Sequence, residues 1–131
     1  AETRACMDRK DDEGLFRAIA TKIIQVYRTD PRFERIMLFA GLEGHELANL
    51  YHRHFAIPIF DMLRDYIAKR QRARALRACN PGLVILAIAG MAQHYGMSTQ
   101  FYGVCGLGFS DKEAINAFTG ILMKGLRLHP K

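Results

Sequence analysis

The sequence predicts an all-α fold of about six helices. Apolar side chains recur at three- and four-residue steps through most of the 131 residues, which is the period of an amphipathic helix. The strict alternation of a half-buried strand is nowhere sustained. Asp30-Pro31 and Asn80-Pro81 each combine a preferred N-cap residue with a proline at the first helical position. We therefore expect a bundle of helices around one core.

The N-terminal residues lack this pattern. Residues 1–11 are mostly polar and charged, and we expect them to form a mobile linker. Residues 12–131 then make up the folded domain, a length that suits one compact unit with a sizeable core.

Asp11 or Asp12 is expected to cap the first helix, which ends before Pro31. Its apolar stripe consists of Leu15, Phe16, Ile19, Ile23, Val26 and Tyr27. Pro31 begins the second helix, whose end we place at Gly41 or Gly44.

A long helix with an interruption is predicted from His45 onward. Pro58 removes a backbone donor within it and should kink the helix. The helix then resumes, because apolar residues continue at helical spacing from 59 to 67.

The helix that starts at Pro81 is apolar on every side, and such a helix is buried all round. A domain of this size can hardly wrap one of its own helices completely, so the second face suggests a partner subunit. Ala89-Gly90 would let that partner approach closely.

The glycine-rich residues 96–109 predict a loop or a frayed helix end. Ser110 and Glu113 then match a capping box. The last helix carries the apolar stripe Ile115, Phe118, Thr119, Leu122, Met123 and Leu126.

The composition excludes a disordered chain, because 50% of the residues are hydrophobic and 24% charged. The net charge of +6 suits an acidic partner such as nucleic acid. Cys6, Cys79 and Cys105 fit no disulfide framework, so we expect free thiols and a cytoplasmic location. No apolar run approaches the roughly 20 residues that span a bilayer, so we expect no membrane partner.

Several segments together resemble one family. Residues 33–48 are similar to the segment that opens the regulatory core in one branch of the TetR family of transcriptional regulators. The helix interrupted by Pro58, with the run 66–70, resembles the helix that crosses that family's ligand cavity. Residues 117–126 look like its closing helix, which ends in L-x-G-L.

A further match lies at 75–81, which resembles the family's G-x-L/F-R-x-x-D-P entry to the first dimer helix. Arg74 or Ala73 stands in place of the glycine, and Asn80 in place of the aspartate. The resemblance covers residues 15–127. The family's three-helix DNA-binding unit, which would bind the operator, is expected to lie outside this sequence.

The resemblance implies the effector-binding and dimerisation domain of a TetR-type regulator, and it favours a repressor. A small hydrophobic or aromatic effector would bind between the helices and shift the protein towards a state that releases operator DNA. The candidate ligand-binding residues lie in the middle of stripes that would converge: Tyr51, His54, Phe55, Met62, Met91 and Tyr95.

The same resemblance implies a homodimer. The helices at 81–95 and 111–127 of two subunits would pair into a four-helix bundle. The candidate interface residues are Ile85, Ala89, Phe118, Leu122 and Met123.

Two other classes of function stay open: a helical interaction module with a solid core, and a small helical enzyme. No acid, base and nucleophile stand at a recognisable spacing, so the sequence predicts no catalytic residue. His52 and His54 point to different sides of a helix and no Cys/His spacing matches zinc, so we expect no metal and no cofactor.

Overall fold

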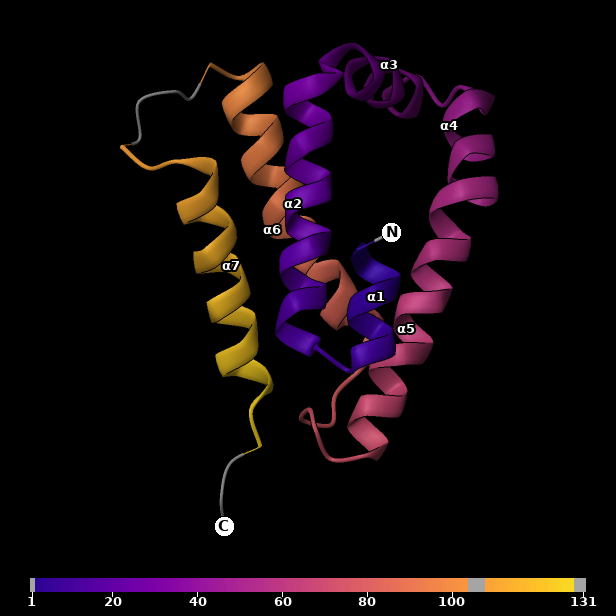
Figure 1. Ribbon diagram of the computed structural model, residues 1–131. Coiled ribbons are helices and arrows are strands. Elements are labelled where there is room, and N and C mark those ends of the chain that lie inside the picture. Colours follow the sequence, from indigo (N-terminus) through magenta and orange to yellow (C-terminus); the bar gives the residue numbers. More distant parts are fainter. Residues whose placement is uncertain (1, 104–107, 129–131) are drawn as a thin grey trace.

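The computed structural model describes residues 2–103 and 108–128, which form helices joined by short connections and contain no strand (Figure 1). The all-α prediction is confirmed for this part of the chain. The elements are α1 (Glu2–Arg9), α2 (Asp12–Thr29), α3 (Pro31–Leu42), α4 (Glu46–Tyr51), the π-helical turn η1 (His52–Ala56), α5 (Ile57–Arg72), α6 (Pro81–Phe101) and α7 (Asp111–Leu126). Since α4, η1 and α5 follow one another without a break, the described residues contain six continuous helices.

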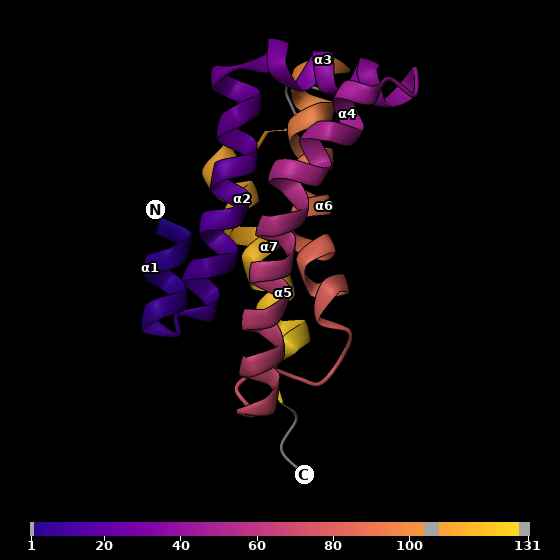
Figure 2. The same ribbon diagram turned by 90° about the vertical axis from the view of Figure 1, so that its right-hand side faces the viewer.

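The central helix is α2, which contacts α1, α6 and α7, while α6 also contacts α5 and α7. Helix α3 lies across one end of the bundle and leads to the long helix formed by α4, η1 and α5 (Figures 1 and 2). Helix α4 packs mainly on α3. Elements α3, α4 and η1 therefore form an arm that stands away from the central helices.

The core is built from the inward faces of α2, α5, α6 and α7. Its buried apolar side chains include Leu15, Phe16, Ile24, Ile67, Val84, Ile88 and Leu126. Burying one such leucine, isoleucine or phenylalanine contributes about 1.5–3 kcal/mol to folding. Most of the stripe predicted on α2 faces this core, because its spacing follows the turn of the helix.

The predicted helix starts are confirmed. The side chains of Asp30 and Asn80 each accept a hydrogen bond from a backbone N–H of the first turn, and a proline follows each of them. Ser110 and Glu113 form both hydrogen bonds of the capping box. Of the two candidates for capping α2, the structure selects Asp11, which accepts from the backbone N–H of Gly14 at 2.9 Å.

The expectation of a linker at residues 1–11 is corrected by the structure. Residues Glu2–Arg9 form α1, which packs on α2 and buries the Cys6 side chain. One buried residue in an eight-residue helix leaves almost no apolar period in the sequence, so the pattern gave no sign of it.

Pro58 interrupts the regular α-helical hydrogen bonding of the long helix, which widens into the π-helical turn η1 just before the proline. In η1 the backbone N–H of Ile57 donates to the carbonyl of His52, five residues earlier. Pro58 has no N–H for the carbonyl of His54, and its ring crowds that carbonyl in a regular α-helix. Widening the turn relieves this conflict, and the helix continues as expected.

Helix α6 extends further than the sequence predicts. Of the two alternatives for 96–109, a loop or a frayed helix end, residues 96–101 continue the helix, while 104–107 lie outside the described residues. Gly96 signalled a loop in the sequence, but it serves close packing, because its Cα faces the ring of Tyr27. Glycine has both uses, and the sequence does not distinguish them.

Arg74 ends α5 in the left-handed conformation, with φ at +61°. The N–H of Arg74 donates to the Gln71 carbonyl at 3.0 Å and that of Ala75 to the Arg70 carbonyl at 2.9 Å, which is a Schellman motif. Glycine is the residue that adopts this conformation without cost.

Arg74→Gly is therefore expected to raise the free energy of unfolding by about 0.5–1 kcal/mol. Urea denaturation followed by circular dichroism measures this change. Arg72→Gly, two residues earlier and within α5, is the matched control and should lower stability by a similar amount. The two substitutions should therefore have effects of opposite sign. A loss of stability in both variants would contradict the assignment of Arg74 to the helix cap.

Candidate functional site

An open groove lies between α3 and the helix formed by α4 and η1. Its volume of about 570 Å³ falls within the range of small-molecule sites. Apart from one imidazole and one phenol hydroxyl the lining is apolar: Phe33, Ile36, Met37, Leu47, Leu50, Tyr51, His54 and Phe55.

Aromatic contacts hold the arm around this groove. The ring centroid of Tyr51 lies 5.3 Å from that of Phe33 on α3 and 5.6 Å from that of Phe55 on η1. Such edge-to-face and tilted pairs stabilise by about 0.5–1.5 kcal/mol beyond their buried area. Because His54 and Phe55 belong to η1, the wide turn before Pro58 sets where both side chains lie along the groove.

The structure brings together three of the six predicted ligand-binding residues. Tyr51, His54 and Phe55 line the groove, whereas Met62, Met91 and Tyr95 lie elsewhere. The prediction that all six converge is therefore corrected. All six lie on apolar stripes of their helices. Tyr51, His54 and Phe55 belong to the arm, which stands away from the central helices, so their stripe does not meet the stripes of α5 and α6.

Met62 lines a second open hollow of about 460 Å³, between α1 and α5. Five of its eight lining residues carry a charge, and its members besides Met62 are Met7, Asp8, Lys10, Asp65, Tyr66, Lys69 and Arg70. Met91 is half-buried and packs against the core. Neither methionine shares a cavity with Tyr51.

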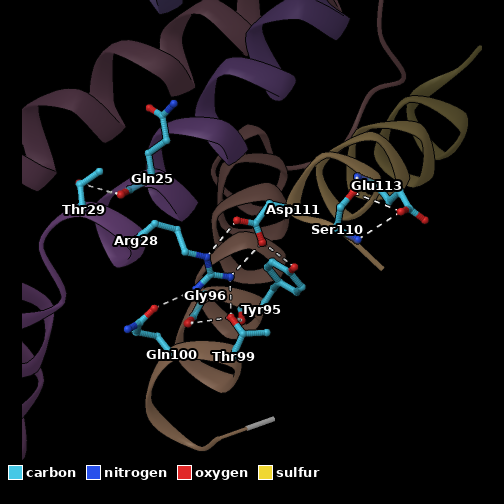
Figure 3. Close-up of polar contacts among 10 residues, drawn as sticks. All are labelled: Gln25, Arg28, Thr29, Tyr95, Gly96, Thr99, Gln100, Ser110, Asp111 and Glu113. Atoms are coloured by element: carbon cyan, nitrogen blue, oxygen red, sulfur yellow. Dashed lines mark hydrogen bonds and ion pairs between the residues drawn. The ribbon is translucent and has the colours of Figure 1, made fainter. Parts of the chain in front are cut away.

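Tyr95 belongs to a polar cluster that joins three helices (Figure 3). Its hydroxyl donates to the Asp111 carboxylate at 2.7 Å. The guanidinium of Arg28 donates to the same carboxylate at 2.9 and 3.0 Å, and to the Thr99 hydroxyl at 2.7 Å. The cluster ties the end of α2 to α6 and to the first residue of α7, so Tyr95 has a structural role.

Arg28 also changes the ionisation of Asp111. The guanidinium holds the pKa of that carboxyl below its ordinary value of 3.8, the Tyr95 hydroxyl lowers it further, and burial works against both. A carboxyl with a lowered pKa in the folded state stabilises above its unfolded pKa, and this stability is lost as the pH falls through the folded value.

Asp111→Asn is accordingly expected to cost about 1–2 kcal/mol at pH 7. Hydrogen bonds to a charged group contribute about 1.5–3 kcal/mol, and the 42% exposure of the Asp111 side chain weakens them. The difference from the unsubstituted chain should shrink as the pH falls below the ordinary carboxyl pKa of 3.8, because the unfolded chain takes up the proton before the folded one does. Thermal unfolding at several pH values measures it. A difference that stays constant down to pH 2 would contradict the proposed charge of Asp111.

The predicted interface residues differ in how far they are covered within one subunit. Ile85 and Leu122 are buried in the chain's own core, and Phe118 and Met123 pack against that core. Ala89 is half-buried. Residues already covered within one subunit add little apolar surface to a contact with another.

Other residues of the same two helices are exposed instead. Leu83 and Leu86 on α6 are 62% and 57% exposed, and Ile121 on α7 is 63% exposed. A Cβ added at Gly90, on the exposed side of α6, would meet nothing within 4 Å. The sequence predicted a second apolar face on α6 made of Ile85, Leu86, Ala89, Gly90 and Ala92. The structure exposes Leu86 and Gly90, half-buries Ala89, and buries Ile85 and Ala92 in the chain's own core.

The described residues offer no group of three or more His, Cys, Asp or Glu side chains that could hold a metal ion. Within the same part of the chain, every helix is too short or too polar to cross a membrane. Comparisons of the chain with models of protein families, with curated proteins and with solved structures find no match.

Proposed function

We propose that this chain is the effector-binding and dimerisation domain of a TetR-type transcriptional regulator, acting as a repressor. Operator DNA would be bound by a separate three-helix unit. A small, largely apolar effector in the groove between α3 and α4–η1 would favour the arrangement of subunits that does not bind DNA.

The observation that carries the proposal is that large apolar side chains are exposed on both α6 and α7, namely Leu83, Leu86 and Ile121. Large exposed apolar surfaces mark sites of protein contact. Because α6 and α7 run antiparallel and pack on each other (Figure 1), two copies could join them into a four-helix bundle.

Two further features support the proposal. The left-handed backbone at Arg74 lies at one of the two positions, Ala73 or Arg74, that stand in place of the glycine of the similar TetR pattern. The apolar groove lies on the long helix with Pro58, which resembles the helix that crosses the ligand cavity in that family.

Sedimentation equilibrium tests the dimer directly. The chain should sediment as a dimer at micromolar concentration. Leu86→Glu and Ile121→Glu should each raise the dissociation constant at least about a hundredfold, since each buries two unpaired charges in a symmetric interface. Leu42→Glu on α3, where the side chain is 76% exposed, is the matched control and should leave the dimer intact. A monomeric unsubstituted chain would overturn the proposal.

A helical interaction module is the second candidate. The groove is open to solvent and its lining is almost wholly apolar, so an amphipathic helix of a partner protein could bind to the same lining. Binding of a small molecule in the groove, tested below, favours the regulator over this candidate.

A further inference from the structure

We propose that the groove between α3 and α4–η1 binds a small monocarboxylic acid with an apolar body, whose carboxylate is held by Tyr51 and His54. This inference rests on the proposed function and names the chemical class of its effector. It follows from three observations: the shape and lining of the groove, two polar groups without partners, and the charge around them.

The groove fits the apolar body of such a molecule. Six of its eight lining residues have apolar side chains from end to end, and these come from both walls: Phe33, Ile36 and Met37 from α3, and Leu47, Leu50 and Phe55 from α4–η1. Methionine adapts its shape to varied apolar ligands. Burial of a hydrocarbon chain between these walls supplies the main part of the affinity.

The two remaining residues supply the polar end. Among the described residues nothing forms a hydrogen bond with the Tyr51 hydroxyl or the His54 ring. His52 differs, because its Nδ1 lies 2.9 Å from the Ala48 carbonyl and its side chain is outside the groove. A phenol and an imidazole can each donate to a carboxylate oxygen.

The surrounding charge favours an acid over an amine. From 47 to 60 the chain contains no aspartate or glutamate, while Arg53 carries a positive charge and forms no ion pair within the described residues. On α3, the charge of Glu34 acts on Tyr27, and neither residue lines the groove. No residue that lines the groove is acidic, so a carboxylate bound there meets no negative charge from the lining itself.

Isothermal titration calorimetry with decanoate and decanol tests the proposal. The two probes have the same chain length and differ in the polar group. Decanoate should bind at least about tenfold more tightly than decanol, because hydrogen bonds to a charged group are the stronger ones.

The variants Tyr51→Phe and His54→Leu should each weaken decanoate binding about tenfold and leave decanol binding unchanged or stronger. His52→Leu is the matched control on the same turn and should change neither affinity. Circular dichroism melts establish that each variant is folded.

Four results would overturn the proposal: equal affinity for the two probes, no binding of either, decanoate binding that survives both groove variants, or an equal loss in His52→Leu. If decanoate and decanol bound equally tightly, the carboxylate would play no part, but an apolar effector and the proposed function would still be compatible with the result. The dimer test with Leu86→Glu is independent of the probes, so its failure would be recognised separately.

Discussion

Replacing Asp12 by alanine is expected to lower the free energy of unfolding by about 3–5 kcal/mol. Asp12 is 8% exposed, and its carboxylate accepts hydrogen bonds from Arg70 at 3.0 to 3.2 Å and from the Tyr66 hydroxyl at 2.6 Å. This cluster joins the first turn of α2 to the last turns of α5. Alanine would leave a guanidinium with a partly buried, uncompensated charge and a phenol hydroxyl without its acceptor.

The strength of the cluster depends on both partners being present. The Asp12 carboxylate raises the pKa of Arg70, and burial together with that carboxylate raises the pKa of Tyr66, so both groups keep their protons. A buried ion pair is costly to break on one side but often neutral to replace as a whole. The double variant Asp12→Leu/Arg70→Met should therefore recover most of the stability that is lost when only Asp12 or only Arg70 is replaced.

Urea denaturation of the single and double variants measures these effects in one series. The matched control is Glu13→Ala, the next residue along α2, which removes an exposed pair with Arg17 at 3.5 Å. Such pairs contribute about 0–1 kcal/mol. If Asp12→Ala cost no more than Glu13→Ala, the cluster would not hold α2 and α5 together.

Local chemistry made the helix starts predictable from the sequence. Asp30-Pro31 and Asn80-Pro81 act within a single turn, so three or four consecutive residues are enough to predict where the helix begins. The stripe of α2 was equally readable, because one of its faces is polar. These features gave the all-α class and most helix boundaries.

The site was less predictable, because it depends on which elements meet. Arg28 and Asp111 are 83 positions apart, and no local pattern links them to Tyr95. Tyr51 and Tyr95 look alike in the sequence, since each lies on an apolar stripe, yet one lines the groove and the other joins three helices. Likewise, adjacent Ile85 and Leu86 differ in burial on a helix whose sequence is apolar on all sides.

Gly96→Ala is expected to lower the free energy of unfolding by about 2–3 kcal/mol, at the upper end of the range for overpacking. A Cβ at this position would lie 2.5 Å from Cδ2 of Tyr27 and 2.9 Å from its Cγ. The Tyr27 ring is 4% exposed, packs edge-on against Phe101 and donates its hydroxyl hydrogen to Gln93. Burial raises the pKa of Tyr27 to about 12, so the phenol keeps that hydrogen at neutral pH. The ring has nowhere to move, and α6 would have to shift away from α2.

Gly90→Ala in the same helix is the matched control, and thermal unfolding of the two variants compares them. A Cβ at Gly90 meets nothing within 4 Å, so alanine should stabilise an isolated subunit by about 0.5–1 kcal/mol through its higher helix propensity. In the proposed dimer Gly90 lies on the surface where a second subunit approaches, so the same substitution should weaken association in sedimentation equilibrium. If Gly96→Ala were neutral, the close approach of α6 to α2 would not stabilise the fold. If Gly90→Ala left the dimer unchanged, the subunits would meet away from this glycine.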